Sequence, residues 1–143
     1  MSTYDTDFYA WTQAQAAALR AKDWTALDLE HLAEEIESMG KRDRRAVESI
    51  LVVRLGHGLK WVYQPARRSG SWRRTLTVSR QRLARILRDH HTLRAELPDL
   101  IPLAYADARE LAAAETSLPL ATFPEACPWR PEQVLAADFP PEA

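Results

Sequence analysis

The sequence lacks the features of a disulfide-stabilised or membrane-anchored protein. Cys127 is the only cysteine among 143 residues, so no disulfide can form within the chain, and a reducing cytoplasm is the expected compartment. No apolar run approaches the roughly 18 residues that suggest a membrane span. The first charged residues are acidic, Asp5 and Asp7, whereas a signal peptide begins with basic residues. We therefore expect a cytoplasmic protein that has no membrane segment.

Glycine is scarce as well, with four residues in the chain, and β-branched residues show little of the alternation that marks strands. Apolar residues recur instead three and four positions apart, as at Leu29, Leu32 and Ile36, which is the spacing of an amphipathic helix. A length of 143 residues is typical of one domain. The sequence predicts an all-α fold, a compact helical bundle of about five helices formed as a single domain over residues 1–143.

Capping and stop signals divide this bundle. They place helices at about residues 6–20, 25–39, 41–63, 72–90 and 98–115. Asp5 or Thr6 is expected to cap the first helix and Ser71 the fourth. Gly40 is expected to end the second helix, and Pro98 with Pro102 to mark the start of the fifth.

The last segment, residues 118–143, is rich in proline, which forbids a long helix. Its prolines stand at positions 119, 124, 128, 131, 140 and 141. We expect an extended tail packed on the bundle, with one short helical turn after Pro131. Its expected anchors are Phe123, Trp129, Leu135 and Phe139.

Charge is strongly segregated although the net charge is −1. Residues 1–37 carry eight acids and two bases, residues 38–94 carry three acids and fifteen bases, and residues 95–143 carry nine acids and two bases. Such a chain can neutralise its basic middle with its own ends, or can present a basic face to a polyanion. Because the acids of the ends outnumber the bases of the middle, we expect internal neutralisation.

Several motifs occur in order along the chain. Near the N-terminus they are DFYAW at residues 7–11, LDL at 27–29 and EEIESMG at 34–40. HGLKW at 57–61, QP at 64–65 and SWR at 71–73 follow, and the tail adds ET at 115–116, FP at 123–124, CP at 127–128 and DF at 138–139. Together they resemble the bacterial family called domain of unknown function 29. The resemblance implies an all-helical, cytoplasmic bacterial protein and implies no activity. His31 and Gly58 depart from the family pattern, so no family-wide function is expected of His31.

Motifs of common enzymes are absent. The sequence contains no phosphate-binding glycine-rich loop with its lysine, no nucleophile elbow and no paired-histidine zinc motif. It also lacks the two Glu-x-x-His units of a di-iron bundle. We expect no cofactor, no metal site and no conventional enzyme.

One cluster of polar residues nevertheless stands out as a candidate site. It comprises Glu34, Glu35, Glu37, His57 and Lys60. An internal salt-bridge network with His57 as a hydrogen-bonded core residue is the first interpretation, since buried carboxylates need partners. A metal site using Glu35 and His57, a polar pocket for a small ligand, and an unrecognised enzyme around Glu34, Glu35 and His57 are the alternatives.

A second candidate site is basic and aromatic. Its residues are Arg67, Arg68, Trp72, Arg73 and Arg74. Arginines beside aromatic rings are typical of surfaces that bind single-stranded nucleic acid, and a helix N-terminus can hold phosphate. Against this, a pI near 6.4 is low for a nucleic-acid-binding domain.

The sequence thus favours a helical protein-interaction or accessory module that binds a protein partner or self-associates through an apolar helix face. A nucleic-acid-binding protein that uses the basic segment 38–94 is the alternative. No membrane partner is expected.

Overall fold

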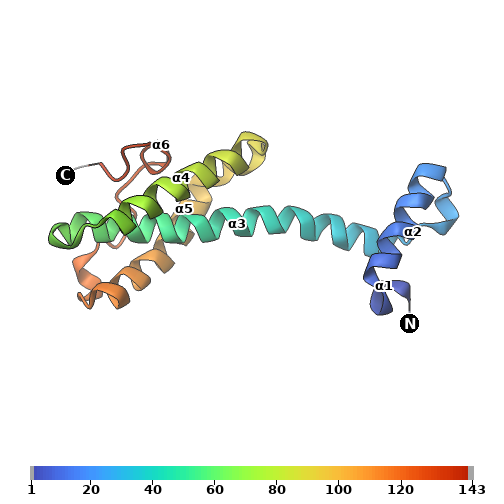
Figure 1. Ribbon diagram of the computed structural model, residues 1–143, viewed down its shortest axis with the longest axis horizontal. Coiled ribbons are helices and arrows are strands. Elements are labelled where there is room, and N and C mark those ends of the chain that lie inside the picture. The colour runs from blue at the N-terminus through green and yellow to red at the C-terminus, as the bar shows by residue number, and fades with distance from the viewer. Residues whose placement is uncertain (1, 142–143) are drawn as a thin grey trace. The chain divides into compact units, whose positions relative to one another are not determined.

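The computed structural model describes residues 2–141, which contain helices and no strand. Its elements are α1 (Thr3–Thr6), α2 (Phe8–Ala21), α3 (Leu29–Tyr63), α4 (Gly70–Arg88), α5 (His91–Thr116) and α6 (Pro131–Val134) (Figure 1). Short 3₁₀ turns lie at Trp24–Ala26, Pro65–Arg67 and Leu120–Thr122. The structure is 79% helical, so the all-α prediction is confirmed. No helix within residues 2–141 is long and apolar enough to cross a membrane.

The chain divides into two units, one up to Arg42 and the other from Asp43 onward. The division falls within α3, which therefore contributes residues to both units. The expected helix end at Gly40 is wrong, because α3 is continuous from Leu29 to Tyr63. Glycine ends a helix by adopting a positive φ, and no described glycine does so. Inside a helix it costs only about 1 kcal/mol relative to alanine, which good helix formers on both sides outweigh.

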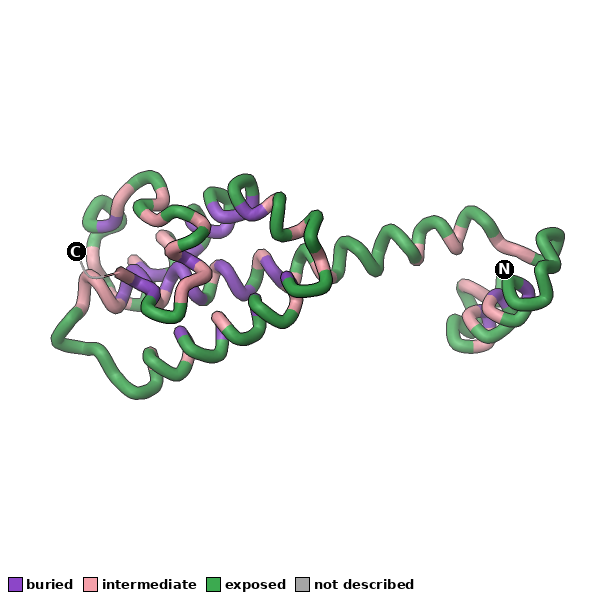
Figure 2. Tube along the Cα trace, turned by 90° about the horizontal axis from the view of Figure 1, so that it is seen from above, coloured by how far each residue is buried: buried purple, intermediate pink, exposed green. Residues whose placement is uncertain are grey.

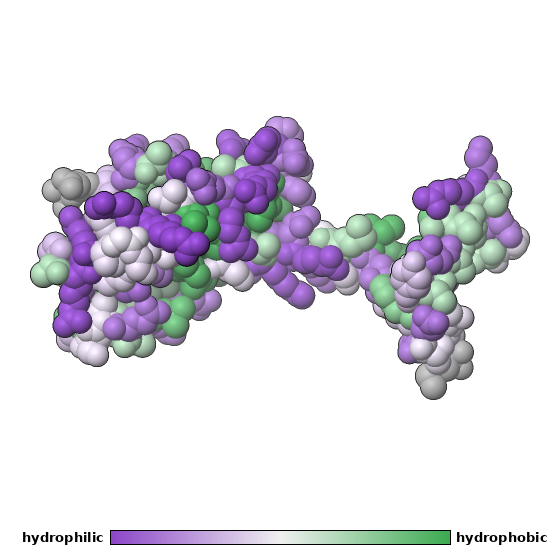
Figure 3. Space-filling model, viewed as in Figure 1, coloured by the Kyte–Doolittle hydropathy of each residue, from purple (hydrophilic) through white to green (hydrophobic). Residues whose placement is uncertain are grey.

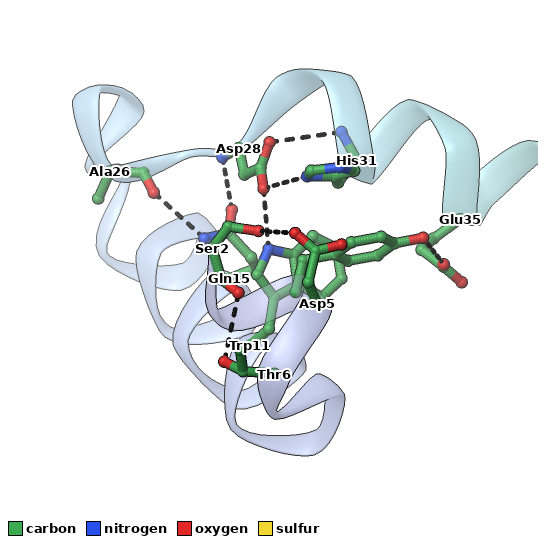
Figure 4. A network of polar contacts seen from close by, with 10 residues as sticks. Ser2, Asp5, Thr6, Trp11, Gln15, Ala26, Asp28, His31 and Glu35 are labelled. Carbon is green, nitrogen blue, oxygen red and sulfur yellow. Dashed lines mark hydrogen bonds and ion pairs between the residues drawn. The ribbon is translucent and has the colours of Figure 1, made fainter.

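The first unit has a small core around α2. Asp7 caps α2 by accepting a hydrogen bond from the Ala10 amide, one residue beyond the caps that the sequence suggested. Trp11 is buried, and its Nε1 donates to Asp28 over 3.0 Å. Buried Gln15 donates to the Ala26 carbonyl and accepts from the Asp28 amide at 2.7 Å (Figure 4). These bonds hold α2 to the start of α3.

The second unit contains the larger core, formed by α3, α4, α5 and the tail. Figure 2 shows its buried residues concentrated where these segments pack together. The core includes Leu51, Leu55, Leu59, Leu83, Leu87, Leu97, Leu100, Tyr105, Phe123 and Val134. Gly56 packs against α5, where an added Cβ would lie 3.7 Å from the Ala108 carbonyl oxygen, an ordinary van der Waals contact. The apolar residues of three helices and the tail are thereby buried together.

Helix α5 begins at His91, so the expected start at Pro98 is wrong. Pro98 and Pro102 lie inside the helix on its exposed side. Proline has no backbone N–H, so the carbonyl group four residues before each proline lacks its helical hydrogen bond. On the exposed side of the helix these carbonyl groups stay open to water, which lowers the cost of proline in a helix. The other side of α5 buries Leu97, Leu100 and Ile101, and this burial stabilises the helix across both prolines.

The proline-rich tail packs on the second unit as expected. Phe123 and Phe139 are buried, and Trp129 and Leu135 pack half-buried against the core. The expected helical turn after Pro131 is α6. The Tyr105 hydroxyl donates to the Pro124 carbonyl over 2.6 Å, which ties the tail to α5.

Candidate functional site

The three glutamates of the predicted polar cluster all lie in the first unit. Glu35 accepts a hydrogen bond from the Tyr4 hydroxyl over 2.6 Å (Figure 4). This bond to the carboxylate raises the pKa of Tyr4 to about 12. Glu34 and Glu37 are exposed. Glu35 therefore has a structural partner from α1, while the other two carboxylates face solvent.

A histidine that the sequence analysis set aside has a defined place beside Glu35. The Nδ1 of His31 lies 2.7 Å from Asp28, and its ring stacks on Tyr4 with 3.9 Å between centroids. The bond to Asp28 raises the pKa of His31, and the same bond lowers the pKa of Asp28. Asp28 also accepts from Trp11, so this group joins α1, α2 and the start of α3 (Figure 4).

His57 and Lys60 belong to the second unit, where the carboxylate beside them is that of Glu115. The buried Lys60 ammonium contacts Glu115 of α5 at 2.6 Å and lies 5.1 Å from the Trp72 ring. His57 bonds through Nδ1 to the Val53 carbonyl at 2.9 Å, and burial lowers its pKa. The sequence identified Lys60 as a member of an ion pair. It did not predict its partner Glu115, which lies 55 residues further along the chain.

A cavity of about 60 Å³ lies beside Lys60 and Glu115 and is also lined by His57. Ligand pockets usually measure about 300–1,000 Å³, so this cavity does not fit a small-molecule substrate. Glu35 and His57 lie 22 residues apart in the same helix, whereas side chains of one helix meet at separations of three or four. Within residues 2–141, no group of three histidine, cysteine or acidic side chains could hold a metal ion.

Two of the predicted arginines, Arg68 and Arg73, lie against one tryptophan ring in the second unit. Arg68 donates from Nε to the Trp61 carbonyl over 2.8 Å, and its guanidinium carbon lies 4.8 Å from the Trp61 ring centroid. The guanidinium carbon of Arg73 lies 5.6 Å from the same centroid. Trp61 thus contacts two of the four predicted arginines. Cations already cover the rings of Trp61 and Trp72.

The charge of this region faces solvent. Arg67, Arg68, Arg73 and Arg74 are exposed, and none has a carboxylate within 4.0 Å among the described residues. Helix α4 carries six arginines and no acidic residue. Two ion pairs join the basic middle to the acidic third segment, Lys60–Glu115 and Arg44–Glu96 at 3.7 Å. Acidic residues of the third segment therefore neutralise two basic residues of α3. The arginines of α4 have no acidic partner in the described chain.

A groove lies between α3 and α4. The sequence patterns did not predict it. The groove encloses about 290 Å³. It is lined by Ala46, Ser49, Ile50 and Val53 of α3 and by Arg74, Thr75, Val78, Ser79 and Arg82 of α4. Figure 3 shows hydrophobic surface over α3 and α4 with hydrophilic surface beside it. The sequence does contain a pattern that indicates this side of the groove. Arg74, Val78 and Arg82 follow one another at intervals of four residues, so they share one side of a helix.

The walls of this groove are held in place by a buried cation, Arg54. Its guanidinium donates to the carbonyl groups of Leu76 at 2.6 Å, Val134 at 2.6 Å and Ala136 at 2.8 Å. Burial, followed by the nearby charge of Arg80, lowers the pKa of Arg54 to about 10. Arg54 thus links α3 to α4 and to the tail with no carboxylate, and its role is structural.

Comparison with known proteins agrees with the order of motifs. The family described as "Domain of unknown function DUF29" matches residues 3–140. No curated protein and no solved structure gives a significant match. The match covers both units and the tail, and the chain belongs to this family.

Proposed function

We propose that this protein is a helical interaction module whose groove between α3 and α4 binds an amphipathic helix with acidic residues. One observation carries the proposal: an apolar floor lies next to arginines that have no acidic partner among the described residues. The polar cavity beside Lys60 is too small to support a small-molecule site at that place.

The floor of the groove supports a helix as the occupant. Val53 is 46% exposed and Val78 is 37% exposed, and the buried Ile50 of α3 also lines the groove. Covering such side chains is favourable, at about 25 cal/mol for each Å² of apolar surface. An amphipathic helix meets a groove of this kind with apolar residues at positions i, i+3 or i+4, and i+7.

The arginines of the groove support an acidic partner. Arg74 and Arg82 lie eight residues apart in α4, which corresponds to about 12 Å along the helix axis. A partner with two acids about two turns apart can meet both guanidinium groups, and arginine binds carboxylates through two parallel hydrogen bonds. A basic helix would be repelled.

We place this function in the cytoplasm of a bacterium, as the resemblance of the motifs implies. The use of a single cysteine, Cys127, supports that placement. It is a free, half-buried thiol, and burial raises its pKa, which keeps it in the unreactive thiol form.

Methyl NMR tests the proposal directly. A synthetic helical peptide with leucines at i, i+3 and i+7 and glutamates on one flank is titrated into the protein. We expect shifts at the methyl groups of Ile50, Val53 and Val78, and no shift when lysines replace the glutamates. Val78→Asp should abolish binding, whereas Leu103→Asp, at an α5 residue that is 62% exposed, should not. Binding confined to residues outside the groove would contradict the proposal.

Binding of single-stranded nucleic acid is the second candidate function. Eight arginines between Arg67 and Arg88 stand without a carboxylate within 4.0 Å in the described chain, and such a surface attracts phosphates. The tryptophan rings support it less, since bases would have to displace the cations that already cover Trp61 and Trp72. The salt dependence of binding tests this candidate.

A further inference from the structure

We infer that the helix bound in the groove belongs to a second copy of this chain and is the N-terminal part of its α3, residues 29–39. This inference rests on the proposed function and names the partner of that site. It arises from apolar and acidic side chains of the first unit that have no partner among the described residues.

The segment 29–39 exposes three large apolar side chains on one side of α3. Leu29 is 69% exposed, Ile36 is 66% exposed and Met39 is 58% exposed. Residues seven apart in a helix differ in direction by only about 20°, so Leu29 and Ile36 form a row. Met39 lies three residues after Ile36, on the neighbouring part of the same side. This is the pattern of a helix that docks in a groove.

Two glutamates accompany this apolar row. Glu30 and Glu37 are exposed, lie seven residues apart, and form no ion pair within 4.0 Å among the described residues. Their separation along the helix is about 10.5 Å, close to the about 12 Å between Arg74 and Arg82. The spacing of the acids therefore fits the spacing of the arginines at the groove, and opposite charges in such a contact fix its register.

The partner is a second molecule because every copy of the chain carries both the groove and a segment that complements it. Leu29, Ile36 and Met39 match the apolar floor, and Glu30 and Glu37 match the arginines. Each copy offers one segment 29–39 and one groove. Two copies can thus exchange segments reciprocally, which gives a closed dimer in which each contact occurs twice.

Charge reversal on each side of the contact tests the inference. The variant E30R/E37R changes the segment, and R74E/R82E changes the groove. We expect size-exclusion chromatography with light scattering to give twice the monomer mass for the wild type and the monomer mass for each variant alone. An equimolar mixture of the two variants should recover the dimer, because each segment then meets a groove of opposite charge. This recovery also shows that both variants fold.

Matched variants control for the change of net charge. D107R/E110R reverses two exposed acids of α5, and R85E/R88E reverses two exposed arginines of α4 that do not line the groove. Both should remain dimeric. A wild-type dimer that survives E30R/E37R and R74E/R82E, or a mixture that stays monomeric, would overturn the inference.

The peptide titration separates this inference from the proposed function. It is repeated on E30R/E37R, whose groove no second copy fills. A wild type that is monomeric at every concentration, together with peptide binding in the groove of E30R/E37R, would overturn the second copy as partner and leave the proposed function standing. Absence of both dimer and peptide binding would overturn both.

Discussion

Gly58 of α3 lies directly against the ring of Phe139: a Cβ built on Gly58 would be 2.6 Å from Cζ of Phe139 and 3.1 Å from the Trp129 ring. The Phe139 ring also lies 4.6 Å from the guanidinium carbon of Arg54. The tail is therefore positioned by close packing on α3 as well as by hydrogen bonds.

Gly58 and Gly40, two of the three glycines of α3, should respond in opposite ways to alanine. Gly58→Ala forces the buried Phe139 to shift, and overpacking of this kind costs about 1–3 kcal/mol. Gly40→Ala meets nothing within 4 Å and should stabilise the helix by about 1 kcal/mol. Urea unfolding measures both. Equal changes of the same sign would contradict the close contact between Gly58 and Phe139.

The bond between His31 and Asp28 predicts a pH window for the first unit. The raised pKa of His31 adds stability that is complete below its ordinary value of 6.5 and is lost as pH rises through the folded value. The lowered pKa of Asp28 adds stability that is present above its ordinary value of 3.8 and is lost as pH falls through the folded value. Together these groups should stabilise the unit most between pH 3.8 and 6.5.

NMR titration of the histidines checks this relation. His31 should titrate above 6.5 and His57 below it. Asp28→Asn should lower the pKa of His31 and leave that of His57 unchanged. An unchanged pKa for His31 in that variant would show that Asp28 is not its partner in solution.

Replacing Arg67, Arg68, Arg73 and Arg74 by alanine should leave the protein folded. Internal neutralisation predicts a destabilised variant with carboxylates left unpaired, but the described structure gives these arginines no carboxylate within 4.0 Å. The stacking of Arg68 and Arg73 on Trp61 is worth about 0.5–1 kcal/mol at an exposed site. Thermal denaturation should therefore show only a small loss.

The same variant decides the nucleic-acid alternative. If the four arginines contact phosphates, binding of single-stranded DNA weakens with a slope of about −3 in log affinity against log salt. The variant then loses most of this binding and keeps its fold. Binding that is equal in the wild type and the variant would place any polyanion site elsewhere.

Lys60 and Glu115 should contribute unequally to stability. Glu115→Gln leaves a buried ammonium without its carboxylate, and breaking a buried pair in this way costs up to about 3–5 kcal/mol. Because the Glu115 side chain is 54% exposed, we expect the lower part of that range or less. Lys60→Met replaces the buried charge by an apolar side chain of similar length and should cost less. Denaturant unfolding of both variants and of the double variant measures the difference.

The sequence by itself determined the class of fold and the docking of the tail. Apolar spacing and the shortage of glycine predict helices, because helical periodicity is a local property of the chain. Prolines from 119 to 141 with aromatic anchors predict an extended tail, and Phe123 and Phe139 are buried as expected. Residue type alone also singled out Lys60, Arg68 and Arg73, each of which contacts a tryptophan ring.

Only the tertiary structure decided which groups meet. Gly40 lies within α3 because its flanking residues extend the helix through it, and Pro98 is tolerated in α5 because it faces solvent while Leu97 and Leu100 are buried. Glu115 rather than Glu35 pairs with Lys60, and the groove exists only where α3 and α4 pack side by side. Such contacts join residues tens of positions apart, and their formation depends on how helices pack in three dimensions, which no local spacing in a single sequence specifies.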